Sequence, residues 1–258
     1  MKNTLLTTMT LGIGLTAMSN AALVHRYSFD TDVSDSIGAA DGALLGTATV
    51  SGGALQLDGA GYAALDSNSI AISGFSEVTM EAWWSHDSQA NWGRVFDFGD
   101  TNGSGMGRNY LFYSPVGDPG GDAAQYAAIS DADPGFNNED FINLPGKLAN
   151  GAYHMALTFN NATDTMTLFI DGVQVGQNTA ATINLSDVSD AHAYLGEASY
   201  PGDNNLSGSI DEFRIYNTAL SAQEVAASFA AGADVVPEPS SSALLGLGAL
   251  ALILRRRK

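Results

Sequence analysis

The chain has 258 residues, no cysteine and a formal net charge of −18, with 28 acidic against 10 basic side chains. A field this acidic repels the phosphates of nucleic acids, so we expect no nucleic-acid partner. Without cysteine there is no disulfide framework, and the hydrophobic core, with or without a bound metal, must stabilise the fold.

Residues 1–21 have the features of a secretory signal peptide. Lys2 supplies the charged start, a weakly apolar stretch runs from Leu5 to Met18, and Ser19-Asn20-Ala21 is a small-x-small cleavage site. The alternative is an N-terminal helix packed in the core. We predict a signal peptide because the other end of the chain, described below, also indicates export.

Alternating apolar residues predict strands in the region that follows. Residues alternate in four segments, 23–29, 78–84, 155–159 and 166–170, and apart from His25 every second residue in them is apolar. In the first segment Leu23 and Tyr27 are expected on the same face. Alternation repeated through turn-rich sequence is typical of an antiparallel sandwich, in which one face of each sheet is buried and the other is wet.

The clearest local signal is Asp171-Gly172, which separates the segments 166–170 and 173–175. An Asp-Gly pair between two short strands predicts a two-residue hairpin turn, because both turn positions need positive φ. Asp41-Gly42 and Asp58-Gly59 are further turn candidates with less regular flanks.

Residues 99–146 are dense in Gly, Asp, Asn and Pro, with short apolar pieces at 110–113 and 126–129. We interpret them as strands joined by long surface loops, and we place the acidic pair Glu139-Asp140 in a loop. Loops held by a rigid scaffold are where binding residues concentrate, so this region is where we expect a binding site.

One helix is predicted near the end of the sandwich, beginning at Ser221. Ser221 and Glu224 have the spacing of a capping box, and alanine-rich sequence follows until Gly232 ends the helix. Residues 233–236 then form a linker.

Three segments in order resemble the concanavalin A-like, laminin G-like (LamG) jelly-roll family. They are 27–30 with Asp35, Gly38 and Asp41-Gly42; 153–159 with 168–173; and Gly208-Ser-Ile-Asp-Glu-Phe-Arg-Ile-Tyr-Asn217 with 219–224. The resemblance covers nearly all of 22–232 and implies an all-β antiparallel jelly-roll sandwich whose first and last strands are adjacent. It also implies recognition of glycans or proteins, or simple display, often near a structural calcium, and no catalysis.

Residues 237–258 have an order that suits no globular domain: Pro237-Glu238-Pro239, three serines, an apolar run over 243–254, then four cations. Cations after an apolar run stay on the cytoplasmic side of a membrane. The 12-residue run spans about 18 Å of helix, short of a hydrocarbon core of about 30 Å, so its passage through lipid is expected to be transient.

This tail resembles the PEP-CTERM sorting signal of Gram-negative bacteria, which implies export, processing by an exosortase-type membrane protease, and delivery to the cell surface or extracellular matrix. The alternative is an ordinary tail anchor. Removing both ends takes away five basic residues and one acidic residue. The remainder has 27 acidic and 5 basic side chains, a net charge of −22.

A calcium site is predicted around Asp211. Alternation places Asp211 on the side of Phe213 and Ile215, where a carboxylate is costly unless it is paired or coordinates a cation. Calcium takes oxygen ligands. The resemblance implies Asp30 as a second ligand, and the loop ending at Asp41 could supply further oxygens. The alternative is that Asp211 accepts from backbone amides and Asp30 caps a turn.

Five aromatic residues are candidates for stacking on sugar rings: Trp83, Trp92, Tyr110, Tyr113 and Tyr126. Trp83 shares a strand face with the charged Glu81, which predicts a position off the core. Trp92 lies between Asn91 and Gly93 and is the clearest loop aromatic. For each of the five, structural packing is the alternative.

Catalysis is not indicated. Related glucanases of this sandwich carry Glu-x-Asp-x-Glu on one strand, whereas Glu81 is followed by Ala82 and Trp83, and the four histidines have no metal-ligand spacing.

We therefore predict an exported, non-catalytic protein of the cell envelope or exopolysaccharide matrix that binds a glycan or acts in adhesion. Two alternatives stay open. One is a purely structural matrix protein whose acidic surface organises water and cations. The other is a glycoside hydrolase or polysaccharide lyase with an unrecognised site.

Overall fold

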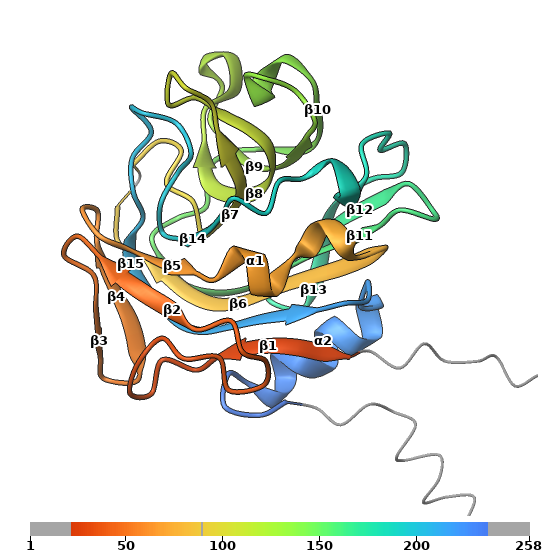
Figure 1. Cartoon of the computed structure of the whole chain (residues 1–258). Helices are drawn as coiled ribbons and strands as arrows, with labels where there is room; N and C mark the ends of the chain where they lie inside the picture. The colour runs from red at the N-terminus through yellow and green to blue at the C-terminus, as the bar shows by residue number, and fades with distance from the viewer. Residues whose placement is uncertain (1–21, 89, 237–258) are drawn as a thin grey trace, which may run out of the picture. The chain divides into compact units, whose positions relative to one another are not determined.

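The computed structural model describes residues 22–88 and 90–236, which form two antiparallel sheets packed face to face (Figure 1). This confirms the predicted all-β jelly-roll sandwich. The predictions for the signal peptide and for the sorting motif Pro237-Glu238-Pro239 lie outside the described residues. Within the described ranges, no helix is both long and apolar enough to cross a membrane.

The first sheet has eight strands, with the last strand of the chain near its centre. In spatial order they are β13 (Val173–Asn178), β12 (Thr165–Ile170), β11 (Gly151–Asn160), β6 (Glu77–His86), β15 (Ser207–Tyr216), β4 (Ala54–Asp58) and β3 (Thr49–Ser51). The eighth strand, β1 (Leu23–Tyr27), pairs antiparallel with β15. The first and last strands are therefore adjacent, as the family resemblance implies.

The second sheet has seven strands and carries the region 99–146. In spatial order they are β10 (Glu139–Pro145), β9 (Ala124–Ser130), β8 (Gly107–Gly117), β7 (Phe96–Thr101), β14 (His192–Leu195), β5 (Tyr62–Leu65) and β2 (Gly42–Leu45). The apolar pieces at 110–113 and 126–129 lie inside β8 and β9. The Glu139-Asp140 pair begins β10, so its placement in a loop is wrong.

Six short helices complete the described chain. The α-helices are α1 (Ser67–Ile70) and α2 (Ala222–Ala231), and the 3₁₀ turns are η1 (Ile72–Gly74), η2 (Pro119–Gly121), η3 (Gly135–Asn137) and η4 (Leu185–Asp187). The predicted capping box is confirmed, since Ser221 and Glu224 each accept from the other's backbone N–H. Gly232 ends α2 at φ 86°.

The main core lies between the two sheets and is built from the inward-facing half of each strand. Met80, Trp84, Leu157, Phe213 and Ile215 come from the first sheet, and they meet residues such as Phe96, Leu111 and Tyr113 from the second. The alternation expected in 155–159 and 166–170 is confirmed on this inward face. In β1 a bulge between Leu23 and His25 breaks the alternation. As a result Leu23 packs on the outer face of the sheet while Tyr27 is in the core.

The hairpin at Asp171-Gly172 is confirmed, with φ of 49° and 75° at its two turn residues. Asp41-Gly42 is not a hairpin turn, because Gly42 begins a strand whose partner is β5. Asp58-Gly59 is a turn of another kind: it joins β4 of the first sheet to β5 of the second, with Gly59 at φ 83°. The chain changes sheets here.

Helix α2 packs on the outer face of the first sheet, and we call the surface beneath it the covered face. Val225 of α2 and Leu220 contact Ala156, Phe169 and Tyr216, whose side chains point away from the main core. Burial of these apolar groups attaches the helix to the sheet.

A charged network centred on Arg214 is also buried at the covered face, between α2 and the sheet. The Arg214 guanidinium lies 4.5 Å over the Trp83 ring, donates through Nε to Glu212 at 2.6 Å, and lies 3.6 Å from Glu81. Its Nη1 donates to Ser228 of α2 at 3.3 Å, and its Nη2 donates to the carbonyl of Ala233. Glu212 and Arg214 belong to the family-like segment 208–217, so that motif supports the helix packing.

Candidate functional site

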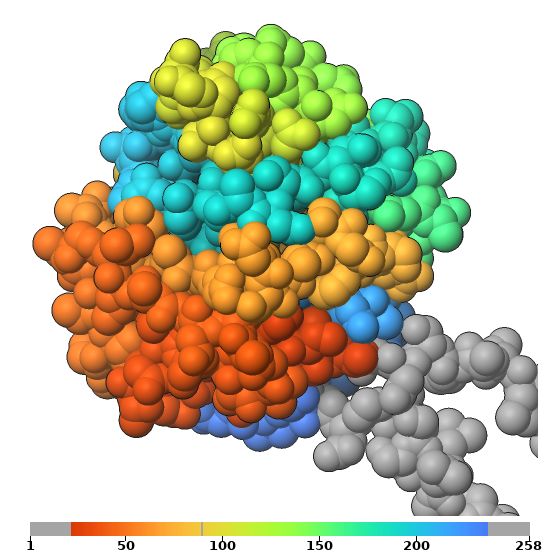
Figure 2. Space-filling model, viewed as in Figure 1, coloured from red at the N-terminus to blue at the C-terminus, as the bar shows by residue number. Residues whose placement is uncertain are grey.

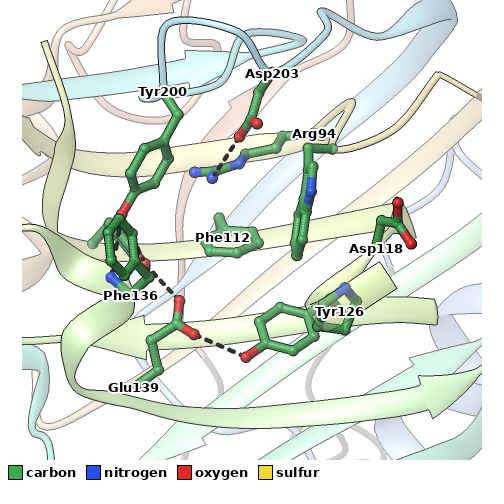
Figure 3. A pocket seen from close by; sticks show the side chains of 12 residues that line it. Arg94, Phe112, Asp118, Tyr126, Phe136, Glu139, Tyr200 and Asp203 are labelled. Carbon is green, nitrogen blue, oxygen red and sulfur yellow. Dashed lines mark hydrogen bonds and ion pairs between the residues drawn. The ribbon is translucent and has the colours of Figure 1, made fainter. Parts of the chain in front are cut away.

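A cavity of about 370 Å³ lies on the outer face of the second sheet, and we call it the aromatic pocket (Figure 3). Six rings line it: Trp92, Tyr110, Phe112, Tyr126, Phe136 and Tyr200. Its charged lining residues are Arg94, Asp118, Glu139 and Asp203. A concave, mainly aromatic site with a few convergent polar groups is typical of a small-molecule binding site.

Strand periodicity creates the floor of the pocket. Tyr110 and Phe112 of β8 point outward, whereas Leu111 and Tyr113 between and beside them enter the main core. Tyr126 of β9 joins the outward set, and its ring stacks on Phe112 with centroids 6.0 Å apart. The outward rings form a separate apolar cluster on the face opposite to the core.

Loops form the walls. Trp92 lies in the loop before β7, at φ 63°, and its ring meets Tyr126 edge-on with centroids 5.6 Å apart. Phe136, 57% exposed, comes from η3, and Tyr200 comes from the segment between β14 and β15. In Figure 2 the yellow and green loops of this region lie at the opposite end of the molecule from the blue residues of α2.

Two glycines make room for the rings. A Cβ on Gly135 would lie 2.1 Å from the Tyr110 ring, and a Cβ on Gly117 would lie 3.0 Å from Tyr126 and 3.4 Å from Trp92. A side chain at Gly135 would therefore displace the ring it faces.

Arg94 is buried, with 1% of its surface exposed, and its guanidinium lies 3.8 Å over the Phe112 ring. It forms an ion pair with Asp97 and a longer one, at 3.4 Å, with Asp203. Its Nε has no hydrogen-bond partner within the described residues. A buried N–H without a hydrogen-bond partner costs stability, so Arg94 is a candidate for a functional role.

Asp97 forms the shorter of the two ion pairs with Arg94. One oxygen of this carboxylate accepts from the backbone N–H of Ser199 at 2.7 Å and from its hydroxyl at 2.6 Å. Arg94 is the main reason that the pKa of Asp97 falls to about 2 despite the opposing effect of burial. His192 bonds Ser199 at 2.9 Å through the same Nε2 that lies 3.6 Å from Asp97. Because one imidazole nitrogen serves both partners, this is not the geometry of a catalytic triad.

Two further carboxylates face the pocket, Asp203 and Glu139. Burial raises the pKa of Asp203 to about 6, although the nearby Arg94 opposes this shift. Glu139 accepts hydrogen bonds from the hydroxyls of Tyr110, at 2.5 Å, and Tyr126, at 2.8 Å (Figure 3). Burial, together with the charge of Glu139, raises the pKa of both tyrosines, so their hydroxyls stay protonated as donors.

Of the five predicted glycan-binding aromatics, the structure brings Trp92, Tyr110 and Tyr126 together in the pocket. Tyr113 lies in the main core. Trp83 lies off the core, as predicted, but on the covered face of the other sheet, where its ring contacts His154 and Arg214.

The expectation that Asp211 faces the core is wrong. A β-bulge between Ile210 and Glu212 inserts Asp211 as an extra residue, and its side chain is exposed. The hydroxyl of Ser209 donates to it at 3.3 Å. Ile210 and Phe213 enter the core in its place.

The other two predicted calcium ligands are also exposed, Asp30 in the loop after β1 and Asp41 immediately before β2. Among the described residues there is no group of three or more His, Asp or Glu side chains arranged to hold a metal ion. Calcium binding at Asp30, Asp41 and Asp211 therefore stays a prediction.

A carboxylate organises the loop that was expected to offer oxygens to calcium. The buried Asp35 accepts from His25 at 2.6 Å and from the backbone N–H groups of Arg26, Gly38 and Ala40. These hydrogen bonds outweigh burial and lower the pKa of Asp35 to about 2. The loop directs N–H groups inward, onto this side chain.

Sequence reasoning did not identify several lining residues, among them Arg94, Phe112, Phe136, Tyr200 and Asp203. The segment 110–113 is apolar throughout, so alternation does not reveal which residues face outward. Arg94 and Asp203 are 109 residues apart, and their pairing depends on the tertiary fold.

Two family models match the chain. The Laminin_G_3 model of the concanavalin A-like lectin/glucanases superfamily matches residues 57–226, and the PEP-CTERM protein-sorting motif matches residues 235–258. The second match indicates an exported protein with a C-terminal sorting signal. No curated protein matches the chain.

Solved structures share the fold at low identity. Domain 4 of AbnA, an extracellular arabinanase of Geobacillus stearothermophilus, in complex with arabinotriose, is 21% identical with a TM-score of 0.63, over 81% of this chain and 98% of that one. The CBM40 domain of a Ruminococcus gnavus sialidase is 16% identical with a TM-score of 0.56, over 67% of this chain and 95% of that one. The binding domain of botulinum neurotoxin serotype C1 is 14% identical with a TM-score of 0.58, over 81% of this chain and 51% of that one.

Proposed function

Because the chain belongs to the concanavalin A-like lectin/glucanases superfamily, we propose that it is an exported, non-catalytic glycan-binding protein whose binding site is the aromatic pocket. The observation that carries the proposal is the convergence of six rings and three rim carboxylates around one cavity on the outer face of the second sheet. Two structural neighbours that hold sugars support it: domain 4 of the arabinanase is in complex with arabinotriose, and the CBM40 domain is also known bound to α2,3-sialyllactose.

The chemistry of the lining suits a sugar. Flat rings such as Trp92 and Tyr126 cover the apolar C–H face of a pyranose or furanose and lose little side-chain entropy when they do so. Carboxylates such as Asp118 and Asp203 accept hydrogen bonds from sugar hydroxyls. Asp118 is already oriented, because Asn91 donates to it at 2.9 Å.

The C-terminal motif places the protein in the export pathway. We propose that an exosortase-type protease processes this signal, with transient passage of the apolar run through the membrane, and that the sandwich then binds an exopolysaccharide at the cell surface or in the matrix. The acidic surface of the sandwich keeps it soluble there.

A glycan array probed with the purified protein, followed by calorimetry on the best oligosaccharide, tests the binding function. We expect saturable binding that Trp92→Ala weakens. Trp83→Ala is the matched control, since it removes the same side chain from the covered face. If no glycan binds, the purely structural matrix protein becomes the better description.

One observation favours a second candidate, a glycoside hydrolase. A carboxyl group whose pKa is raised to about 6, as that of Asp203 is, in an aromatic pocket that Asp118 and Glu139 also line has the properties of a general acid. Incubation with a panel of polysaccharides, with new reducing ends as the readout, tests this function. Turnover that Asp203→Asn abolishes would establish the enzyme and overturn the non-catalytic proposal.

A further inference from the structure

The aromatic pocket contains more negative than positive charge. Asp118, Glu139 and Asp203 line it, and Arg94 is the single lysine or arginine among its lining residues within the described chain. A ligand carboxylate entering this space would meet three carboxylates and one cation.

The charge of Arg94 is already paired within the protein. The guanidinium of Arg94 is enclosed by Phe112 at 3.8 Å and Tyr200 at 5.4 Å, and it pairs with Asp97 and Asp203. Only 1% of the residue is exposed. A ligand carboxylate that approached the Nη2 atom facing Asp203 would have to displace the ion pair between the two side chains.

A second cation, outside the lining, is also engaged. Lys147 donates to the side-chain oxygen of Asn91, and the amide of Asn91 donates in turn to Asp118. Lys147 itself does not line the cavity.

Asp203 differs from the other carboxylates of the lining because it forms an ion pair with Arg94. It lies in the segment between β14 and β15, half-buried, 3.4 Å from a guanidinium nitrogen, whereas Asp97 holds the opposite side of the same group. Replacing it with an amide would keep its shape and leave Arg94 with one negative partner instead of two.

We propose that Asp203 is a specificity-determining residue: by cancelling the charge of Arg94 it restricts the pocket to uncharged sugars and excludes glycans that carry carboxylates, such as uronic and sialic acids. This inference rests on the proposed glycan-binding function of the same pocket. Neutral hydroxyls satisfy the rim carboxylates, whereas a sugar carboxylate would add a fourth like charge to a partly desolvated site.

The test measures binding of the purified protein to neutral oligosaccharides (arabinotriose, xylotriose, cellotriose, lactose) and to acidic ones (trigalacturonic acid, 3′-sialyllactose). Lactose and 3′-sialyllactose form a matched pair. We expect the wild type to bind at least one neutral sugar and to bind the acidic sugars at least about tenfold more weakly. In Asp203→Asn the ratio of acidic to neutral affinity should rise roughly tenfold.

Asp122→Asn is the control, because it removes the same charge from an exposed position in the loop between β8 and β9 that does not line the pocket. Its affinity ratio should stay at the wild-type value. If Asp203→Asn does not fold, raising salt from about 20 mM to about 500 mM with the wild type provides a second readout, since screening should favour the acidic sugars selectively.

Two results overturn the selectivity while the glycan-binding function survives: equal or tighter binding of acidic sugars by the wild type, or an unchanged ratio in Asp203→Asn together with no selective salt effect. Failure to bind any sugar, neutral or acidic, overturns the proposed function itself, and the selectivity with it.

Discussion

Each outer face of this sandwich contains a buried arginine that lies over an aromatic ring and pairs with two carboxylates, but one face is covered by a helix and the other has a cavity. On the covered face Arg214 lies over Trp83 and pairs with Glu212 and Glu81. On the pocket face Arg94 lies over Phe112 and pairs with Asp97 and Asp203. Figure 1 shows α2 against the first sheet and loops around β8, β9 and β10 of the second.

The comparison shows that a buried arginine above an aromatic ring does not by itself indicate a site. Helix α2 excludes solvent from the covered face, so the charges there contribute to packing and fold specificity. No α-helix covers the rings of the pocket face within the described chain, and a cavity remains. Access therefore distinguishes the functional face from the structural one.

The largest effect is expected on the covered face. Arg214→Met leaves Glu81 and Glu212 without their buried cation, and it should lower the free energy of unfolding by about 3–5 kcal/mol. Urea denaturation measures this. Arg108→Met is the control, because Arg108 forms more exposed ion pairs with Asp100 and Asp133 and should cost less than about 1 kcal/mol. If both substitutions lowered the free energy of unfolding equally, α2 would not exclude solvent from the covered face.

The next prediction uses the pH dependence of stability to distinguish Asp203 on the pocket face from the charged groups on the covered face. Because the pKa of Asp203 is raised to about 6, the folded state holds its proton more tightly than the unfolded state does, so stability falls as pH rises from about 4 to about 6. This loss should reach about 2–3 kcal/mol. Thermal melts across that range should show a smaller decline in Asp203→Asn than in the wild type. Burial also raises the pKa of Glu212 on the covered face, so part of the decline should persist in the variant. If melting temperature fell equally with pH in the wild type and in Asp203→Asn, the assignment of this decline to Asp203 would be contradicted.

The same substitution made on each face, at Trp92 in the pocket and at Trp83 on the covered face, tests whether the two faces differ in function. Trp92→Ala should weaken glycan binding roughly tenfold, equal to about 1.4 kcal/mol, because it removes a ring from the pocket wall. Trp83→Ala should leave binding unchanged and lower stability by about 1–2 kcal/mol through lost packing and the lost contact with Arg214. Calorimetry and urea denaturation measure the two quantities. A binding defect in Trp83→Ala would mean that the faces are coupled.

Calcium has the smallest expected effect and concerns neither face directly. Exposed carboxylates bind the ion weakly, so calcium near its dissociation constant should contribute about 0.4 kcal/mol and raise the melting temperature by about 1–2 °C. Asp211→Asn should abolish the rise. A melting temperature that is unchanged both by calcium and by exhaustive chelation would eliminate the site.

Local chemistry made part of this fold predictable. The hairpin at Asp171-Gly172 and the helix that begins at Ser221 follow from positive φ and from capping, both of which depend on neighbours in sequence. The bulge at Asp211 does not, because it depends on which strand pairs with β15. The hairpin turn Gly52-Gly53 between β3 and β4 was missed, although both residues have positive φ.

The candidate site was predictable in part for the same reason. Trp92 could be identified from its loop-like neighbours, and Tyr110 and Tyr126 from their residue type. The separation of Tyr113 from Tyr110 could not, since both belong to one apolar run and only the pleat directs them to opposite faces. Arg94 and Asp203 form a pair only when the segment between β14 and β15 folds against the loop before β7.

The bond from Arg214 to the carbonyl of Ala233 has a mechanical consequence. Ala233 lies just after α2, where the described chain leads toward its C-terminal segment, on the side of the sandwich opposite to the pocket. Tension applied through that segment would reach Arg214 and hence β15, a strand that β1, β4 and β6 all pair with. A pull on the tail would therefore be resisted by the interior of the first sheet, while the pocket on the far side keeps its shape.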